Sequence, residues 1–432
     1  MKVLEIPNFS LDALCQLNAQ RYPFLLESVN HNGNNRYSIL FAHPQQELVL
    51  ENLTDFNFLD AFSSQVVNET TQFSHLPFTG GWFVYLSYEL VGQIEPTLAK
   101  DMHDSKLPIA VAVKIPSAII VDHQLDKTYL LDEQGEQLRI DQLLADIKQV
   151  KLEENLPDFA GLLSCEADVK FLSGVDKIKR YIEAGDVFQV NLSRAWQYTL
   201  ENNCSATQLY KALKQSNPAP FSALAQFQNF SIISSSPERL FSVDGKKVET
   251  RPIAGTHPRG TGAQDDELLK QRLINHPKEQ AEHIMLLDLE RNDLGRVCEY
   301  GSIEVNEVMV LETYPYVHHI VSNIQGRLKP LVNIKHLVKA LFPGGTITGC
   351  PKIRCMQIIS ELEQEPREAY TGSLGYISNN GKMDFNILIR TLIKQQKDLS
   401  FRAGAGIVFD SNADRELEET THKAQGILKV FS

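Results

Sequence analysis

The stretch FSALAQFQNFSIISSSPERLFSVDGKKVET, residues 221–250, decides the fold class of this chain. Asp244-Gly245 within it is a dipeptide typical of a two-residue hairpin turn. Segments joined this closely are antiparallel neighbours, so the stretch predicts an antiparallel sheet. Runs of apolar and β-branched residues predict its strands at 221–228, 230–235, 239–243 and 246–249.

Helical patterns alternate with further strands on both sides of this stretch, which indicates an α+β fold. Pro277 stands at the first turn of one predicted helix and Gly295 ends it. Helices are predicted over 138–152, 173–185, 205–216, 265–276, 277–295, 333–341, 351–361 and 413–430. Further strands are predicted near 25–29, 36–42, 80–92, 114–123, 186–200, 302–311, 316–325, 372–379, 382–393 and 399–409.

The chain has 432 residues, which is enough for a large core and for two or three domains, although we expect one large globular body. A polar stretch with Pro157 and Gly161 is the best candidate for a boundary. We therefore predict an N-terminal subdomain over 1–150, a linker or surface loop over 151–165, and a catalytic domain over 166–432.

Composition excludes several classes of function. A formal net charge of -12 argues against a nucleic-acid surface, which needs a concentrated basic face. The N-terminus lacks an apolar signal core, and Lys114 and Pro116 interrupt the most apolar stretch, so we expect a cytoplasmic protein that does not span a membrane. Six scattered cysteines without ligand spacing indicate reduced thiols instead of a zinc site.

Two pairs of glutamates, Glu279/Glu282 and Glu416/Glu419, lie in predicted helices at a spacing of three residues. This spacing puts both carboxylates of a pair on one helical face. If the fold brings the two faces together, four carboxylates converge, and the expected guest is Mg²⁺, which prefers carboxylate oxygens and bridges to anionic substrates. The alternative is two ordinary solvated helices.

Two glycine-rich segments could approach a ligand closely. PGGTITGCPKIR, residues 343–354, offers backbone donors, hydroxyls and a helix N-terminus that suit an oxyanion, although it is not a Walker A loop. AGAGIV, residues 403–408, either lets a ligand reach the backbone or marks a bend in a strand.

The order of motifs along the chain resembles the chorismate-utilising enzymes, strongly over 166–432 and more loosely before that through LLES and GGWFVYLSYE. Within them the chain looks most like component I of aminodeoxychorismate synthase, with component I of anthranilate synthase close behind. The motifs are GDVFQVNLSR (185–194), SSPERL (235–240), ETRPIAGTHPRG (249–260), AEHIMLLDLERNDLGRVC (281–298), VHHIVSNI (317–324), PGGTITGCPK (343–352), GSLGYISNNGKMDFNILIRT (372–391) and AGAGIVFDS (403–411).

The resemblance implies two antiparallel sheets packed as a sandwich with helices outside. It also implies chorismate, a dicarboxylate, as substrate and Mg²⁺ as cofactor. By position Glu282 and Glu419 look like the direct metal ligands, whereas Glu279 and Glu416 resemble the outer carboxylates. A metal beside the ring would neutralise the dianion and ease departure of the C4 hydroxyl.

The resemblance also implies residues that bind the substrate carboxylates. Arg390 matches the arginine that pairs with the enol-pyruvyl carboxylate, unless it makes a surface salt bridge. Lys423, one turn after Glu419, matches a lysine that faces the site, although a helix ion pair would look the same. The remaining carboxylate-binding elements are Tyr370 and the backbone of Gly404, Ala405 and Gly406.

Three residues match the catalytic positions of the family. His319 corresponds to a histidine near the leaving hydroxyl, with an expected pKa near the operating pH, and its neighbour His318 is expected to point outward. Thr346 corresponds to the threonine beside the ring. Glu238 corresponds to an acid/base residue with an expected raised pKa, the alternative being a buried network with Arg239.

Gln189 stands where relatives that add water carry a lysine. A neutral amide cannot activate water, so ammonia is the predicted nucleophile. No glutamine-hydrolysing motif is present in the sequence, so a separate glutamine amidotransferase subunit is expected to supply the ammonia.

Ala254 leaves the product open. Many aminodeoxychorismate synthases carry a nucleophilic lysine in a PIKGT segment, whereas this chain reads PIAGT as anthranilate synthases do. QVNLSR, PGGTITG and GSLGY favour amination at C4 to 4-amino-4-deoxychorismate, a precursor of p-aminobenzoate and folate. The alternatives are anthranilate formation at C2, with loss of pyruvate, and a non-catalytic relative that binds chorismate or tryptophan.

LLES, residues 25–28, resembles the tryptophan-binding element of the family. Glu27 and Ser28 are therefore candidate tryptophan-binding residues. The alternative is a plain buried strand.

Overall fold

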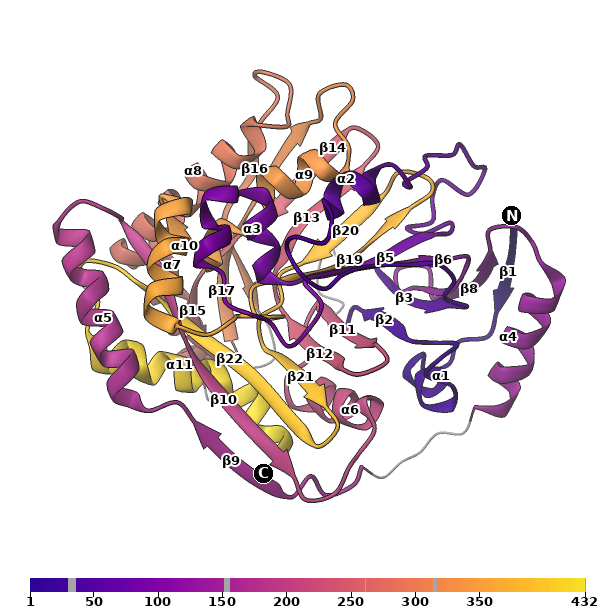
Figure 1. Cartoon of the computed structure of the whole chain (residues 1–432), viewed down its shortest axis with the longest axis horizontal. Coiled ribbons are helices and arrows are strands. Elements are labelled where there is room, and N and C mark those ends of the chain that lie inside the picture. The colour runs from indigo at the N-terminus through magenta and orange to yellow at the C-terminus, as the bar shows by residue number, and fades with distance from the viewer. Residues whose placement is uncertain (30–35, 151–155, 261, 314–316, 432) are drawn as a thin grey trace.

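The computed structural model describes residues 1–29, 36–150, 156–260, 262–313 and 317–431. Two antiparallel sheets face each other and helices cover their outer sides, which confirms the predicted α+β fold (Figure 1). Within the described residues, the larger sheet has twelve strands and the smaller has ten.

The larger sheet runs in the order β1 (Lys2–Ile6), β8 (Lys127–Asp132), β7 (Ser117–Asp122), β3 (Tyr37–Ala42), β2 (Phe24–Glu27), β11 (Phe221–Gln226), β12 (Ser231–Ser236), β21 (Thr391–Gln395), β22 (Asp398–Ile407), β10 (Gln189–Leu200) and β18 (Gly349–Cys350), with β9 (Gly161–Cys165) also paired to β10. The smaller sheet runs β15 (Ile253–Pro258), β17 (Val317–Arg327), β14 (Lys247–Arg251), β13 (Arg239–Asp244), β20 (Met383–Asn386), β19 (Ser373–Ser378), β5 (Gly81–Leu86), β6 (Ala110–Ile115) and β4 (Glu47–Leu50), with β16 (Glu304–Thr313) also paired to β17.

The core between the sheets is aromatic. Phe24 of β2 and Phe83 of β5 stack with their ring centroids 4.0 Å apart, so strands of opposite sheets are in direct contact. All six residues of β5 are buried, because alternate side chains point to opposite faces of a strand. Phe83 and Tyr85 enter the core between the sheets, whereas Trp82, Val84 and Leu86 pack under the helices of the smaller sheet.

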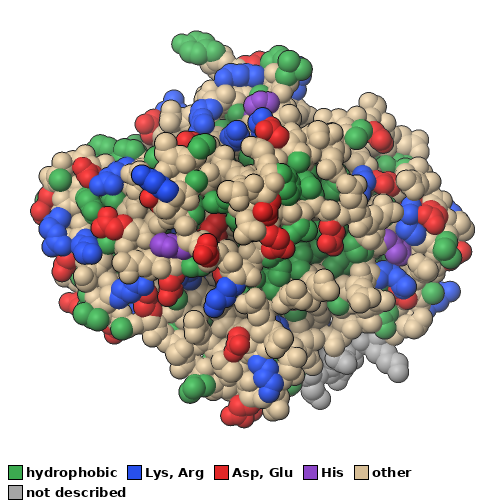
Figure 2. All heavy atoms as spheres, viewed as in Figure 1, with side chains coloured by type: hydrophobic (Ala, Val, Ile, Leu, Met, Phe, Trp, Pro, Cys, Tyr) green, Lys and Arg blue, Asp and Glu red, His purple; other side chains and the backbone are tan. Residues whose placement is uncertain are grey.

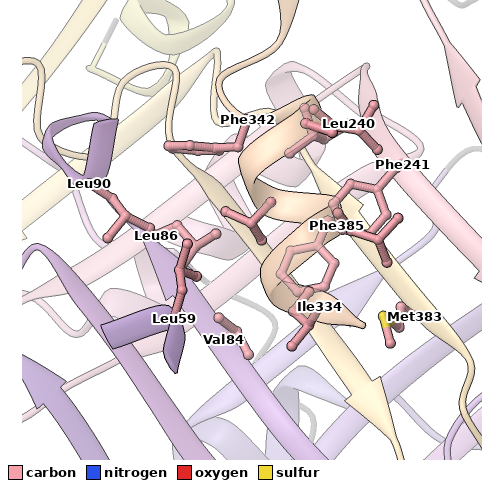
Figure 3. Close-up of a cluster of buried hydrophobic side chains, with 14 of the residues drawn as sticks. Leu59, Val84, Leu86, Leu90, Leu240, Phe241, Ile334, Phe342, Met383 and Phe385 are labelled. Atoms are coloured by element: carbon pink, nitrogen blue, oxygen red, sulfur yellow. The ribbon is translucent and has the colours of Figure 1, made fainter. Parts of the chain in front are cut away.

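Helices bury the outer faces of the sheets. The cluster on the smaller sheet, drawn in Figure 3, joins Phe241 and Phe385 to Leu59 and Ile334 of the covering helices. On the smaller sheet lie α2 (Phe58–Ser63), α3 (Val91–Ile94), α8 (Pro277–Gly295) and α9 (Ile334–Leu341). On the larger sheet lie α1 (Asp12–Leu17), α4 (Gln137–Gln149), α5 (Asp168–Glu183), α6 (Ala206–Ser216), α10 (Lys352–Glu363) and α11 (Ala413–Leu428), while α7 (Ala263–Ile274) contacts β15 to β17.

Strands that lie far apart in the sequence are neighbours in each sheet, as the mixed colours of Figure 1 show. β2 pairs with β11 in one sheet, and β5 pairs with β19 in the other. The boundary predicted near residue 150 therefore does not separate two sheets or two cores. Of the predicted linker, residues 151–155 lie outside the described residues, and Gly161–Cys165 is an exposed edge strand instead of a loop.

Two of the short links by which the chain crosses between the sheets lie side by side. Residues 237 and 238 join β12 of the larger sheet to β13 of the smaller one, and residues 387–390 return from β20 to β21. The N–H of Ile387 donates to the carbonyl of Glu238 at 3.0 Å, and the N–H of Ser235 donates to the carbonyl of Arg390 at 3.1 Å. Two predicted site residues thus occupy neighbouring crossovers.

Charged side chains of both signs are interspersed on the face drawn in Figure 2, without one extended basic area. In the part of the chain that the structure describes, no helix combines the length and the apolar character needed to cross a bilayer.

Candidate functional site

One wall of the candidate site is the paired strands β10 and β22, where Gly404 lies opposite Ser193 and Gly406 lies opposite Asn191. A Cβ atom at Gly404 would stand 2.6 Å from the Tyr370 hydroxyl and 2.7 Å from the Asn191 side-chain oxygen, so no larger residue fits there. Ala405 points to the opposite face and packs in the apolar cluster of α5 and α10. We call Gly404, Gly406 and their strand neighbours the glycine wall.

Polar side chains cover the glycine wall. The Tyr370 hydroxyl donates to the Asn191 side-chain oxygen at 3.4 Å, and burial raises the pKa of Tyr370 to about 12, so the phenol is neutral. Gln189 is buried against Gly406, and its Oε1 has no hydrogen-bond partner among the described residues. An orphaned acceptor beside open backbone indicates room for a ligand with a donor group.

Lys423 ties α11 to the glycine wall. Its Nζ donates to the carbonyl of Gly404 at 3.0 Å and pairs with Glu419 at 2.7 Å. The same positive charge lowers the pKa of both His319 and Glu238, so the ammonium group lies near both.

His319 belongs to β17 and is 2% exposed. Burial, together with the positive charge of Arg390, lowers its pKa to about 3, although the hydrogen bond from the ring to the carbonyl of Gly255 acts in the opposite direction. The imidazole is therefore neutral, which differs from the expected pKa near neutrality. The sequence could not reveal this, because the shift comes from tertiary burial.

Arg390 lies in the crossover before β21 instead of on a strand, and its backbone has φ of 52°. This left-handed conformation turns the chain sharply between the sheets, and the guanidinium acts electrostatically on His319. A cation beside a neutral imidazole suits an anionic ligand.

Glu238 lies in the other crossover and is 5% exposed. Burial raises its pKa to about 7, whereas nearby Thr346 and the N–H of Ile253 lower it. In the part of the chain that the structure describes, its Oε1 and the Thr346 hydroxyl both lack a partner with acceptable hydrogen-bond geometry. The alternative network with Arg239 is not found, because Arg239 makes a bidentate pair with Asp384 at 2.9 and 3.0 Å.

Glu290 of α8 is a site residue that sequence reasoning missed. It is 7% exposed, its Oε1 accepts from the N–H of Gly345 at 3.3 Å, and burial raises its pKa to about 7. Its charge in turn raises the pKa of Glu238. The sequence did contain a signal, because Glu290 lies one turn after the buried Leu286 and Leu287 and therefore on the same face of the helix. A helix face that packs on the core rarely carries a carboxyl group, so such a group indicates a functional site.

Ala254 and His318 lie next to the candidate site residues but offer no reactive group to a ligand. Ala254 is buried on β15 opposite Ile320 and offers no nucleophile. His318 was expected to point outward, but it is fully buried beneath α7, with ring nitrogens 2.8 Å from Asp266 Oδ1 and 3.0 Å from the Thr313 hydroxyl. Its role is structural.

The four glutamates of the predicted metal site lie on α8 and α11. Glu279 reaches Gly255, where its Oε2 is 2.8 Å from the place a Cβ would take. Glu416 is buried, whereas the Glu419 side chain is 47% exposed in its pair with Lys423. Within the described ranges, no three His, Cys, Asp or Glu side chains are gathered in a way that could hold a cation, so magnesium binding by these glutamates and Glu282 stays a prediction.

A separate cavity of about 380 Å³ lies where LLES predicted a tryptophan site. Glu27 and Ser28 line it together with Tyr37, Phe221, Arg239 and Asp384. Glu27 is already engaged, because it accepts from Tyr210 at 2.7 Å and from Lys214 at 3.0 Å. Arg239 lines this cavity, whereas its neighbour Glu238 is not among the lining residues.

Buried acids, a neutral histidine and cationic groups lie near the glycine wall, and this combination of side chains suits an anionic ligand. The family model described as "chorismate binding enzyme" matches residues 22–429, and the chain belongs to this family.

Similarity to individual proteins is divided between two names. The chain is 41% identical over 379 residues to aminodeoxychorismate synthase component 1 of Bacillus subtilis, covering 85% of this chain and 80% of the relative. It is 39% identical over 410 residues to an anthranilate synthase component I-like protein of a Synechocystis strain, covering 94% and 84%. The solved anthranilate synthase component I of Streptococcus pneumoniae superposes with a TM-score of 0.81 at 32% identity, covering 93% and 94%.

Replacing Gly404 by alanine should close the glycine wall. The new Cβ would collide with the Tyr370 hydroxyl and the Asn191 oxygen, so we expect chorismate binding to weaken roughly tenfold or more, about 1.4 kcal/mol. Calorimetric titration with chorismate measures this change. Gly295→Ala is the control, because its Cβ would meet nothing closer than 4.0 Å. Equal affinities for the two variants would contradict this view of the wall.

Replacing Glu238 by glutamine should change how stability depends on pH. The pKa of Glu238 is near 7 in the folded protein and 4.5 in the unfolded chain, so the free energy of unfolding of the wild-type protein falls as pH rises from 4.5 to 7. The glutamine variant has no proton to lose, so it lacks this contribution. The variant should gain roughly 1–3 kcal/mol over wild type on going from pH 5 to pH 8. Thermal unfolding at both values tests this, with exposed Glu51→Gln as control. A pH-independent difference would rule out a buried, raised Glu238.

Proposed function

We propose that this chain is the chorismate-aminating component of an aminodeoxychorismate synthase. It replaces the C4 hydroxyl of chorismate with an amino group from ammonia, releases water, and keeps the enol-pyruvyl group. The observation that supports ammonia over water most directly is the buried, unpartnered Gln189 beside the glycine wall, since an amide cannot act as a base on water. The similarity to the Bacillus subtilis aminodeoxychorismate synthase supports the same reaction.

The cationic and open-backbone groups hold the substrate in this proposal. Arg390 pairs with the enol-pyruvyl carboxylate. Tyr370 and the glycine wall lie on the opposite side of the substrate. Carboxylates placed beside Arg390 and Lys423 would offset the charges that lower the pKa of His319, which makes the imidazole a better proton donor to the leaving hydroxyl.

Glu238 serves as the acid/base group on the ring in this proposal. With a pKa near 7 it can both give and take a proton at neutral pH, and the Thr346 hydroxyl stands beside it. Mg²⁺ held by Glu282 and Glu419, with Glu279 and Glu416 outside them, would withdraw electrons from the substrate when bound.

A second candidate function is anthranilate formation. Ala254 supports it, because the buried alanine on β15 cannot form the covalent adduct that a lysine at this place would form. The Synechocystis relative and the Streptococcus pneumoniae structure carry the anthranilate synthase name. In this reaction the amine enters at C2 and pyruvate leaves in the same site.

Partners are part of the proposal. Ammonia comes from a separate glutamine amidotransferase subunit, and a separate lyase converts the product to p-aminobenzoate for folate synthesis. The cavity at Glu27 and Ser28 would hold tryptophan, since it offers carboxylates, an arginine and aromatic rings.

A product assay separates the two reactions. The protein is incubated with chorismate, Mg²⁺ and ammonium, and the products are separated with and without added aminodeoxychorismate lyase. We expect p-aminobenzoate only when the lyase is present. Anthranilate formed without lyase would overturn amination at C4, and chorismate left unchanged while it still binds would point to a non-catalytic relative.

Replacing Glu419 by glutamine should abolish the Mg²⁺-dependent turnover, because one ligand oxygen loses its charge, while the fold stays intact. Turnover across a magnesium titration and circular dichroism measure the two effects. Glu418→Gln on the same helix is the matched control, since Glu418 is exposed and outside the predicted ligand set. Activity equal to that of the control would count against the metal assignment.

A further inference from the structure

A buried arginine lies behind the glycine wall and takes no part in the proposed chemistry. Arg367 follows α10, three residues before Tyr370, and is 2% exposed. Its guanidinium makes a bidentate pair with Glu363, with Nε to Oε2 at 2.9 Å and Nη2 to Oε1 at 2.7 Å. A paired charge this deeply buried needs its remaining donors satisfied as well.

The remaining donors of Arg367 go to two other parts of the site. Nη1 donates to the carbonyl of Ile347 at 3.2 Å, directly after Thr346, and Nη2 donates to the carbonyl of Asn191 at 2.8 Å, two residues after Gln189. One side chain therefore connects the turn that carries Thr346 to the strand that carries Gln189.

Two aromatic rings contact the same guanidinium. Its central carbon lies 5.3 Å from the ring centroid of Tyr370 and 5.0 Å from that of Tyr88. This stacking holds the ring whose hydroxyl closes on Gly404. Arg367 thus contacts three parts of the candidate site: the turn at Ile347, the strand at Asn191 and the ring of Tyr370.

Glu363 fixes the orientation of the guanidinium. Its Oε1 also accepts from the Ser193 N–H at 2.9 Å and from the Ser193 hydroxyl at 2.8 Å, and Ser193 lies opposite Gly404 in the sheet. Arg402 stands 3.4 Å from Oε2 and donates to the same hydroxyl at 2.9 Å. The acid cannot rotate without breaking several bonds.

We propose that Arg367 is a positioning residue of the chorismate site, which fixes the Thr346 turn against Tyr370 and the Gln189 strand. This rests on the proposed function only in that chorismate is taken as the ligand. The contrasting possibility is that Arg367 only stabilises the fold, in which case its loss lowers stability without acting through Thr346.

Arg367→Lys separates the two roles. Lysine keeps the charge beside Glu363 but lacks the planar group that contacts Tyr88 and Tyr370 and donates to Glu363, Ile347 and Asn191. We expect kcat/KM for chorismate to fall by roughly 10- to 100-fold, mainly through kcat, because the reacting groups are displaced while the carboxylate-binding groups remain.

A double-mutant cycle with Thr346→Ala provides the decisive readout. If Arg367 acts through the Thr346 turn, the fold decrease in kcat/KM of the double variant should be at least about tenfold smaller than the product of the decreases in the two single variants. Arg139→Lys with Thr346→Ala is the matched control cycle, since Arg139, whose side chain is 11% exposed, is also bidentate with an acid, Asp132, but belongs to α4. That cycle should be additive.

Additive losses in the Arg367 cycle, or a lower unfolding temperature with unchanged kcat/KM, would overturn the proposal. If Arg367→Lys yields no folded protein, Glu363→Gln replaces it in the cycle, because it removes the charge that aligns the guanidinium but keeps one acceptor. Rates are measured as loss of chorismate and do not depend on which product forms. Anthranilate as product would therefore contradict amination at C4, while the double-mutant cycle would still test the role of Arg367. If wild type turns over no chorismate, the same cycle is measured on chorismate affinity by calorimetry.

Discussion

The site depends on two links, distant in the sequence but neighbours in space, by which the chain crosses between the two sheets. Glu238 and Arg390 occupy these crossovers, and backbone hydrogen bonds from Ile387 and Ser235 hold the two links together. The stacked rings of Phe24 and Phe83 set the sheets face to face, so the links cannot move apart without opening the core. An acid and a cation are thereby held at fixed places in a buried setting, which is the condition for a shifted pKa.

Burial and the local charges both make the candidate site suited to an anionic ligand. The chain carries a formal charge of -12, yet the groups around the glycine wall are a neutral histidine, two carboxyl groups whose pKa values are raised, and the cations Arg390 and Lys423. The local field therefore favours an anion although the overall field opposes it. The residues that create this contrast come from both sheets and from α8 and α11.

The sequence was sufficient for elements and motifs, because these depend on local patterns. Helices such as 205–216 and 413–430 were predicted to within a few residues, and the antiparallel stretch at 221–250 gave the correct fold class. The division near residue 150 stays a prediction. Gly161–Cys165 was predicted as part of a linker or loop and is a strand, because its pairing with β10, like that of β2 with β11, is decided by partners distant in the sequence. The neutral state of His319 and the part played by Glu290 follow from burial, which a linear pattern does not record.

The two-sided burial of β5 has a consequence for biosynthesis. Its neighbour β19 lies near the opposite end of the chain, so an apolar strand emerges from the ribosome long before the strand that completes its hydrogen bonding. High contact order of this kind slows folding and leaves an unpaired edge open to other chains. The nascent N-terminal part is therefore expected to need protection from aggregation until the last third of the polypeptide has been made.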